Sequence, residues 1–218
     1  MAENRQYDEL LAAAAGRLRG LDLRDIADRA GLEADGAGLR AMSFATRLRI
    51  DGATFAVQPP LEMWHHLALL QYLASADGSL PTGEWMALAE LPEGGVSRGG
   101  SFDREIDALV ANRLGRFEPA TVRAACLALG ARPVDGGRAD LCAEFHFMPR
   151  YPLLLNLWFA DDEFPASGKV LVDAGVRRCL GLEAAGTVAV LLVRSLCEAC
   201  EACEACGACE ACGASKDR

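Results

Sequence analysis

Six cysteines recur at every third residue near the C-terminus of this 218-residue chain, in a run of Glu-Ala-Cys and Gly-Ala-Cys triplets. Thiolates are good ligands for Zn²⁺, Cu(I) and iron–sulfur clusters, and Cys-x-x-Cys is a common chelating spacing. We therefore expect a zinc ion or an iron–sulfur cluster, if one is bound, to be held by this repeat. The predicted ligands are Cys197, Cys200, Cys203, Cys206, Cys209 and Cys212.

The strict period of three also limits what the repeat can do. In an α-helix three residues advance about 300°, so the first and fourth thiols would face opposite directions. A 3₁₀ or polyproline II segment would align the thiols but hold them about 6 Å or 9 Å apart. A closed site therefore requires the chain to fold back, with Gly207 and Gly213 as hinges. The alternative is an expanded tandem repeat that leaves a flexible, low-complexity extension over residues 197–218.

A second group of candidate residues is the acidic turn Asp161, Asp162 and Glu163, which follows an apolar run. Carboxylates at the end of a strand can hold Mg²⁺ or Ca²⁺ or serve as acid and base groups. The glycine- and proline-rich segment 76–100 is long enough to be functional. A pocket between the segment and the turn is one hypothesis. The other is a solvated turn anchored to the core by Phe164 and Pro165.

Three further potential ligands lie on one expected strand, 139–147. Because side chains alternate along a strand, Cys142, Glu144 and His146 share one face. Successive side chains on that face stand about 7 Å apart, which is too far for one metal ion without ligands from elsewhere. A half-buried sheet face is the favoured interpretation.

His65 and His66 are adjacent in an apolar helical segment, beside Trp64. Adjacent helical residues point about 100° apart, so the two rings do not chelate together. We expect one ring to be buried and hydrogen-bonded and the other to be exposed. The glycine-rich segment 93–101 resembles a phosphate-binding loop, but acidic residues follow it, and a flexible connector is the favoured interpretation.

The hydrophobic periodicity predicts the elements that must position these residues. The order places helices and strands in separate blocks, which favours an α+β fold. We expect a single domain over 1–196 with a small, mostly antiparallel sheet packed by helices. The predicted helices are 6–18, 22–31, 61–75, 102–113, 118–130 and 182–196; the predicted strands are 139–147, 153–160 and 169–173, with a hairpin over 39–58 around Asp51-Gly52.

Several segments of the body carry a family resemblance. The chain is similar to the bacterial and archaeal family of domains of unknown function numbered 3786, over about residues 5–196. The resemblance implies one domain and supplies no catalytic residues, since the family has no established activity. It also favours a metal context, because the family occurs in anaerobes rich in iron–sulfur chemistry. The segments that carry it are Leu80-Pro-Thr-Gly-Glu-Trp, Glu90-Leu-Pro-Glu-Gly-Gly, Met148-Pro-Arg-Tyr-Pro, Leu157-Trp-Phe-Ala-Asp-Asp-Glu-Phe-Pro-Ala and Val170-Leu-Val-Asp.

Charge and hydropathy exclude two classes of partner. The net charge is −9, and the arginines are spaced among acids without a cationic cluster, which argues against nucleic acid. The longest apolar runs are near ten residues, below the ~18 expected of a membrane-spanning helix. The N-terminus has no apolar signal core, and nine cysteines is an odd number, so we expect the reducing cytoplasm.

The leading hypothesis is a non-catalytic cytoplasmic accessory protein. It would bind a soft metal through the cysteine repeat and serve a metalloenzyme or another protein partner. The alternative is an enzyme or a small-molecule-binding protein, with a pocket formed by the 76–100 segment and the turn from Asp161 to Glu163.

Overall fold

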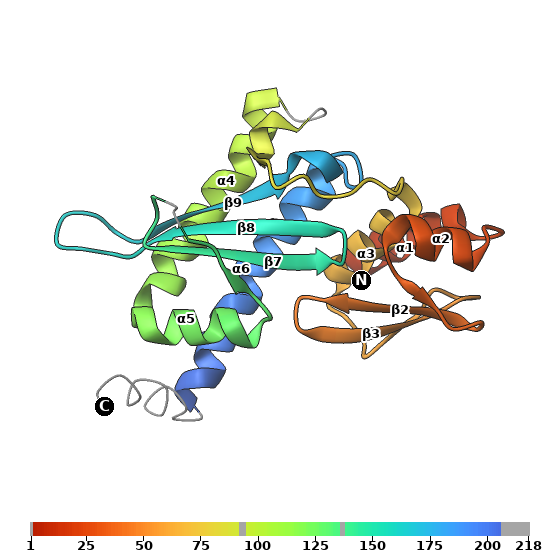
Figure 1. Cartoon of the computed structure of the whole chain (residues 1–218), viewed down its shortest axis with the longest axis horizontal. Coiled ribbons are helices and arrows are strands. Elements are labelled where there is room, and N and C mark those ends of the chain that lie inside the picture. The colour runs from red at the N-terminus through yellow and green to blue at the C-terminus, as the bar shows by residue number, and fades with distance from the viewer. Residues whose placement is uncertain (1, 92–94, 136–137, 206–218) are drawn as a thin grey trace.

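The computed structural model describes residues 2–91, 95–135 and 138–205 and has the expected α+β architecture. Long helices cross behind one five-stranded sheet, and a smaller four-stranded sheet with further helices lies beside it (Figure 1). The helices are α1 (Ala2–Leu18), α2 (Leu23–Ala30), α3 (Met63–Ser75), α4 (Gly95–Asn112), α5 (Pro119–Ala128) and α6 (Leu182–Ala205), with 3₁₀ turns η1 (Leu88–Glu90), η2 (Leu114–Arg116) and η3 (Ala174–Val176).

The strands form two antiparallel sheets where a single sheet was expected. Sheet A has the order β1-β2-β3-β4, and sheet B has the order β5-β9-β8-β7-β6. The apolar strand predicted over 153–160 is indeed central, as β8. The strands are β1 (Glu33–Ala34), β2 (Gly38–Ser43), β3 (Thr46–Asp51), β4 (Val57–Gln58), β5 (Trp85–Ala87), β6 (Arg132–Pro133), β7 (Leu141–Met148), β8 (Tyr151–Trp158) and β9 (Ser167–Asp173).

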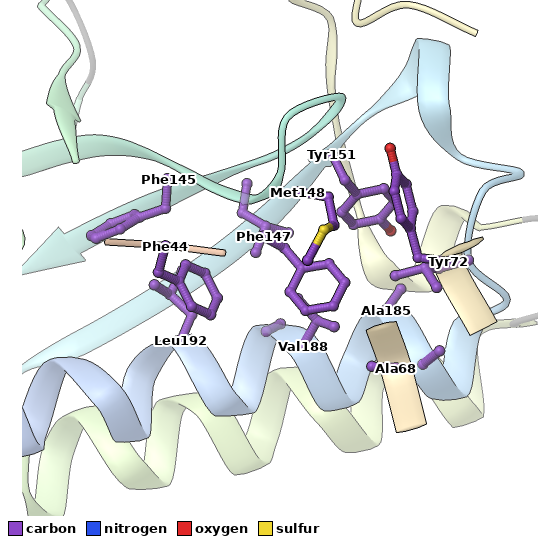
Figure 2. Packing of buried hydrophobic residues seen from close by; sticks show 14 of the residues in the cluster. Phe44, Ala68, Tyr72, Phe145, Phe147, Met148, Tyr151, Ala185, Val188 and Leu192 are labelled. Atoms are coloured by element: carbon purple, nitrogen blue, oxygen red, sulfur yellow. The ribbon is translucent and has the colours of Figure 1, made fainter. Parts of the chain in front are cut away.

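The hydrophobic core lies between sheet B and the helices α3, α4 and α6. Phe145 and Phe147 point from β7 toward α6 and pack in one cluster with Val188 and Leu192 of that helix (Figure 2). Sheet A contacts sheet B near Phe44, whose amide donates to the His146 carbonyl over 2.8 Å. The Phe44 and Phe147 rings are 6.1 Å apart between centroids, so the two sheets share one aromatic cluster.

The predicted hairpin over 39–58 exists, but its turns differ from the expectation. Strands β3 and β4 do pair across Asp51 and Gly52, yet the connection is longer than two residues. The Asp51 carboxylate accepts the amides of Ala53 (3.0 Å) and Thr54 (2.7 Å), and this side-chain turn lengthens the loop. The turn between β2 and β3 lies at Phe44, which has a positive φ of 49°. Glycine usually occupies such a position, so the sequence does not mark this turn.

Helix α4 begins seven residues earlier than predicted. The helix was predicted to begin at residue 102, but it begins at Gly95, and Ser101 lies inside it. The glycine-rich segment is therefore partly helical. Each glycine costs about 1 kcal/mol relative to alanine in a helix, yet no proline interrupts 95–112, and packing of the later turns can offset that cost.

Helix α6 is nine residues longer than the helix predicted over 182–196, and it takes in the first part of the cysteine repeat. Cys197 and Cys200 are both fully buried, and they continue the apolar stripe of Val193 and Leu196. Buried cysteine behaves as a small hydrophobe, and alanine and glutamate are good helix formers. The predicted boundary at 196/197 thus falls inside a helix. No helix in the described ranges has both the length and the apolar character needed to cross a bilayer.

Candidate functional site

The described cysteines of the repeat face α5, which contributes one more thiol. Helices α5 and α6 pack together, and Cys126 of α5 is buried against α6. Cys197 and Cys200 are buried as well, and Cys203 is half-buried. The remaining predicted ligands, Cys206, Cys209 and Cys212, lie outside the described residues.

Burial decides the protonation of this thiol group. It raises the pKa of Cys126 and of Cys200 to about 12, and it also raises the pKa of Cys197. Neighbouring thiols of Cys197, Cys126 and Cys203 raise the pKa of Cys200 further. The buried thiols are therefore protonated near neutral pH, and a metal would have to displace their protons. Within the described ranges no three histidine, cysteine or acidic side chains are arranged to hold a metal ion.

The acidic turn is a solvent-exposed loop between β8 and β9. The Asp161 carboxylate accepts the amides of Glu163 (2.9 Å) and Phe164 (2.7 Å), and these bonds lower the pKa of Asp161. Asp162 and Glu163 are exposed. The expectation that Phe164 anchors the turn to the core is wrong, because 66% of Phe164 is exposed. The turn holds itself together through its own hydrogen bonds.

The structure does not bring the acidic turn and the described part of the 76–100 segment together. Strand β5 pairs with the end of β9, where Trp85 faces Asp173. The acidic turn precedes Ser167 at the opposite end of the same strand (Figure 1). Six strand residues of about 3.3 Å separate the two ends, roughly 20 Å in all. These two segments therefore do not form the expected pocket.

Two of the family-like segments instead meet at one buried carboxylate. Asp173 is fully buried and accepts the amides of Thr82 (3.0 Å), Gly83 (2.6 Å) and Gly175 (2.7 Å). Arg150, in the turn between β7 and β8, donates to the Gly78 carbonyl over 3.4 Å. These bonds attach the 78–84 loop to the ends of β8 and β9. Their role is structural, since every oxygen of the carboxylate is used by the protein.

The outer face of sheet B carries the predicted Cys-x-Glu-x-His group. Glu144 and His146 are brought together, with 2.9 Å between Glu144 Oε1 and His146 Nε2. The same oxygen accepts from Arg132 Nη2 at 3.1 Å, so the carboxylate has two partners. Cys142 is buried beyond them and does not join this pair. This matches the favoured interpretation of a half-buried sheet face.

Both histidines of α3 are partly buried and hydrogen-bonded, so the expectation that one ring would be exposed is wrong. His65 Nε2 lies 2.7 Å from the hydroxyl of Ser43, and His66 Nε2 lies 3.1 Å from the Phe55 carbonyl. Ser43 is fully buried. Because the hydroxyl has no access to solvent, we interpret the Ser43–His65 pair as a link between sheet A and α3.

The pH dependence of stability tests the His65 environment. Burial, with a smaller contribution from His66, lowers the pKa of His65 from 6.5 to about 4. The folded state then resists protonation that the unfolded chain accepts. The contribution of neutral His65 to the free energy of unfolding is therefore fully present above pH 6.5, and it is lost as the pH falls toward 4. Between pH 7.5 and pH 5, wild type should lose about 2 kcal/mol more unfolding free energy than His65→Gln in urea titrations. Parallel pH profiles for the two proteins would contradict this assignment.

A concave surface lies elsewhere, in a groove between α1, α3, α4 and α6 that we call the helical groove. Its volume is about 420 Å³. Gly186 lets α4 approach α6 closely, because a methyl group there would overlap the Phe102 ring. The apolar walls are formed by Leu10, Trp64, Leu67, Phe102, Val190 and Leu191, and the polar rim by Gln71, Glu105, Glu183, Thr187 and Arg194.

Exposed apolar side chains mark the opening of the helical groove. Leu10 is 42% exposed and Trp64 is 40% exposed. Leu191 is buried yet lies outside the main hydrophobic core. Arg194 and Glu105 form a 3.3 Å ion pair across the rim. Sequence reasoning missed the groove, because the periodicity of one helix does not show how four helices pack together.

The comparisons with known proteins identify the family but no activity. The family model described as Domain of unknown function (DUF3786) matches residues 22–195. No curated protein and no solved structure matches the chain. The matched range runs from the N-cap of α2 almost to the buried thiols of α6, so it covers nearly all of the core. The chain therefore belongs to the DUF3786 family of domains of unknown function.

Proposed function

We propose that this protein is a non-catalytic binding protein for a small molecule, with the helical groove as its site. The observation that carries the proposal is the groove itself, a concave, largely apolar surface of about 420 Å³ with a few polar groups on its rim. Small-molecule sites have this character, with volumes of about 300–1,000 Å³ and a small number of polar groups that fix orientation.

The walls determine the kind of molecule that fits. Leu67, Val190 and Leu191 offer aliphatic surface, and Trp64 and Phe102 add aromatic surface. Burial of apolar ligand area against such walls is worth about 25 cal/mol per Å² before the costs of association. The paired Arg194 and Glu105 neutralise each other at one end of the groove. The expected ligand is elongated and has an apolar body.

A blocking substitution tests the site. Thr187 lines the groove from α6 and is only partly exposed, so Thr187→Trp should fill much of the space. We expect the neutral dye Nile red to bind wild type with increased fluorescence and to bind Thr187→Trp roughly tenfold more weakly. Leu127→Trp is the matched control, because it adds the same ring at a 60% exposed helix position outside the groove. Equal dye binding by all three proteins would reject the proposal.

A second candidate function is soft-metal binding through the cysteine repeat, in an accessory role toward a metalloenzyme. The supporting observation is that Cys126 joins Cys197, Cys200 and Cys203 at the α5–α6 contact. Three further cysteines, 206, 209 and 212, follow at the same spacing in the sequence. Thiol groups from two helices and the rest of the repeat would supply the ligands, at the cost of releasing protons.

Elemental analysis of protein purified without oxygen tests this second candidate. Deleting the whole repeat would remove the buried Cys197 and Cys200 from the core, so the better variant is the triple substitution Cys206→Ser, Cys209→Ser and Cys212→Ser. Stoichiometric zinc or iron should be present in wild type and lost in the variant. The triple substitution Ala208→Ser, Ala211→Ser and Ala214→Ser, in the same segment, should keep the metal. Metal-free wild type, or metal retained by the cysteine variant, would reject this candidate.

We also propose a cytoplasmic location. The described cysteines Cys126, Cys142, Cys179, Cys197, Cys200 and Cys203 are free thiols. Reducing compartments maintain cysteines in this state.

A further inference from the structure

A second hollow continues the helical groove at its far end. This polar hollow has a volume of about 280 Å³ and is lined by Arg17, Gln71, Ser75, Leu180, Gly181, Glu183 and Ala184. Gln71, Glu183 and Ala184 also line the helical groove. Because the two hollows share these residues from α3 and α6, they are neighbouring parts of one depression.

The helices show that the two parts lie end to end. Along α1, Leu10 lines the groove and Arg17 lines the polar hollow, about 10 Å further on at 1.5 Å per residue. Along α3 the same direction leads from Trp64 past Gln71 to Ser75, about 16 Å. Along α6 it leads in reverse from Arg194 to Glu183, again about 16 Å. The combined depression is thus long and narrow, with Arg17 and Ser75 at one end.

The charges differ between the two ends. At the groove end, Arg194 is paired with Glu105 at 3.3 Å. At the polar end, no carboxylate of the described residues lies within ion-pair distance of Arg17. Glu183 stands at the boundary and is engaged in an interaction of its own. The guanidinium of Arg17, with the Ser75 hydroxyl and the Gln71 amide as additional donors, suits a carboxylate.

We propose that the helical groove and the polar hollow together bind an aliphatic carboxylic acid. The hydrocarbon chain lies along Leu67, Val190 and Leu191, and the carboxylate pairs with Arg17. This inference rests on the proposed small-molecule function and specifies its ligand class. It requires both an apolar body and an acidic end, since each part of the depression matches one of them.

Competition between two probes with the same chain tests the acidic end. Decanoate should displace Nile red from wild type at a concentration about tenfold lower than the concentration of neutral decanol that has the same effect. Arg17→Gln should weaken the binding of decanoate by about tenfold and leave the binding of decanol unchanged, because only the charged contact is removed. Arg24→Gln, which removes an exposed arginine of α2 outside the depression, is the matched control and should change neither probe.

The outcomes separate this inference from the proposed function. If decanoate and decanol bind equally and Arg17→Gln changes neither, the carboxylate assignment is overturned while the helical groove stands as a binding site. If Arg17→Gln weakens the binding of both probes equally, Arg17 maintains the shape of the depression and does not recognise the charge of the ligand. This outcome also overturns the assignment. If Nile red does not bind wild type, both the groove and the carboxylate assignment fail.

Discussion

Replacing Phe147 with alanine should lower the free energy of unfolding by about 3–5 kcal/mol. Phe147 is fully buried on the inner face of β7, above Val188 of α6 (Figure 2). Its ring is also the centre of the aromatic cluster that joins the two sheets. The centroid distances are 6.1 Å to Phe44, 5.5 Å to His65, 6.4 Å to Tyr72 and 6.2 Å to Tyr151.

The size of the effect follows from where the cavity would form. Removing the ring deletes contacts from sheet A, α3 and sheet B at once, so no single element can move to fill the space. Urea denaturation followed by circular dichroism provides the measurement. Phe164→Ala is the matched control, because the same change at a 66% exposed position should cost less than about 0.5 kcal/mol. A loss below about 1 kcal/mol for Phe147→Ala would show that the sheets are not coupled through this ring.

Asp173→Ala should destabilise the protein by a similar amount, about 3–5 kcal/mol. The fully buried carboxylate accepts amide hydrogen bonds from Thr82, Gly83 and Gly175, and the Thr82 hydroxyl lies 3.3 Å away. Alanine would leave these donors without their acceptor, and hydrogen bonds to charged groups are among the stronger ones. The loop over 78–84 should then detach from the end of β9.

Asp161→Ala separates the effect of burial from that of hydrogen bonding. Asp161 also accepts two backbone amides, at 2.9 Å and 2.7 Å, but it is exposed. Water can replace a lost acceptor there, so this variant should cost only about 1 kcal/mol. Hydrogen exchange should show faster exchange of the Thr82 and Gly83 amides in Asp173→Ala alone. Equal destabilisation by the two variants would mean that burial of Asp173 contributes nothing.

Local patterns were sufficient for most elements of the body. The helices predicted over 6–18 and 22–31 correspond to α1 and α2, and the strand predicted over 139–147 corresponds to β7. Each of these signals involves residues within a few positions of one another, where propensity and side-chain caps act directly. The predicted α+β fold class is confirmed on that basis.

The errors have a common physical cause in contacts between distant segments. Helix α6 runs on through Cys200 because α5 buries its apolar stripe, and a repeat of period three gave no sign of that packing. The turn at Phe44 has no turn-forming residue, and it is held where its amide meets His146 of β7. Local propensity is routinely overridden when tertiary contacts outweigh it.

By itself the sequence determined most of the elements, the α+β class, the absence of a cationic cluster and the presence of a thiol repeat. Only the tertiary structure decided which chemistry-bearing residues meet. It placed Asp161 and the loop around Thr82 at opposite ends of β9, and it buried the first thiols of the repeat against α5. It also assembled the helical groove from four helices that are far apart in the chain. A binding surface depends on such long-range packing, whereas periodicity reports only what one segment buries.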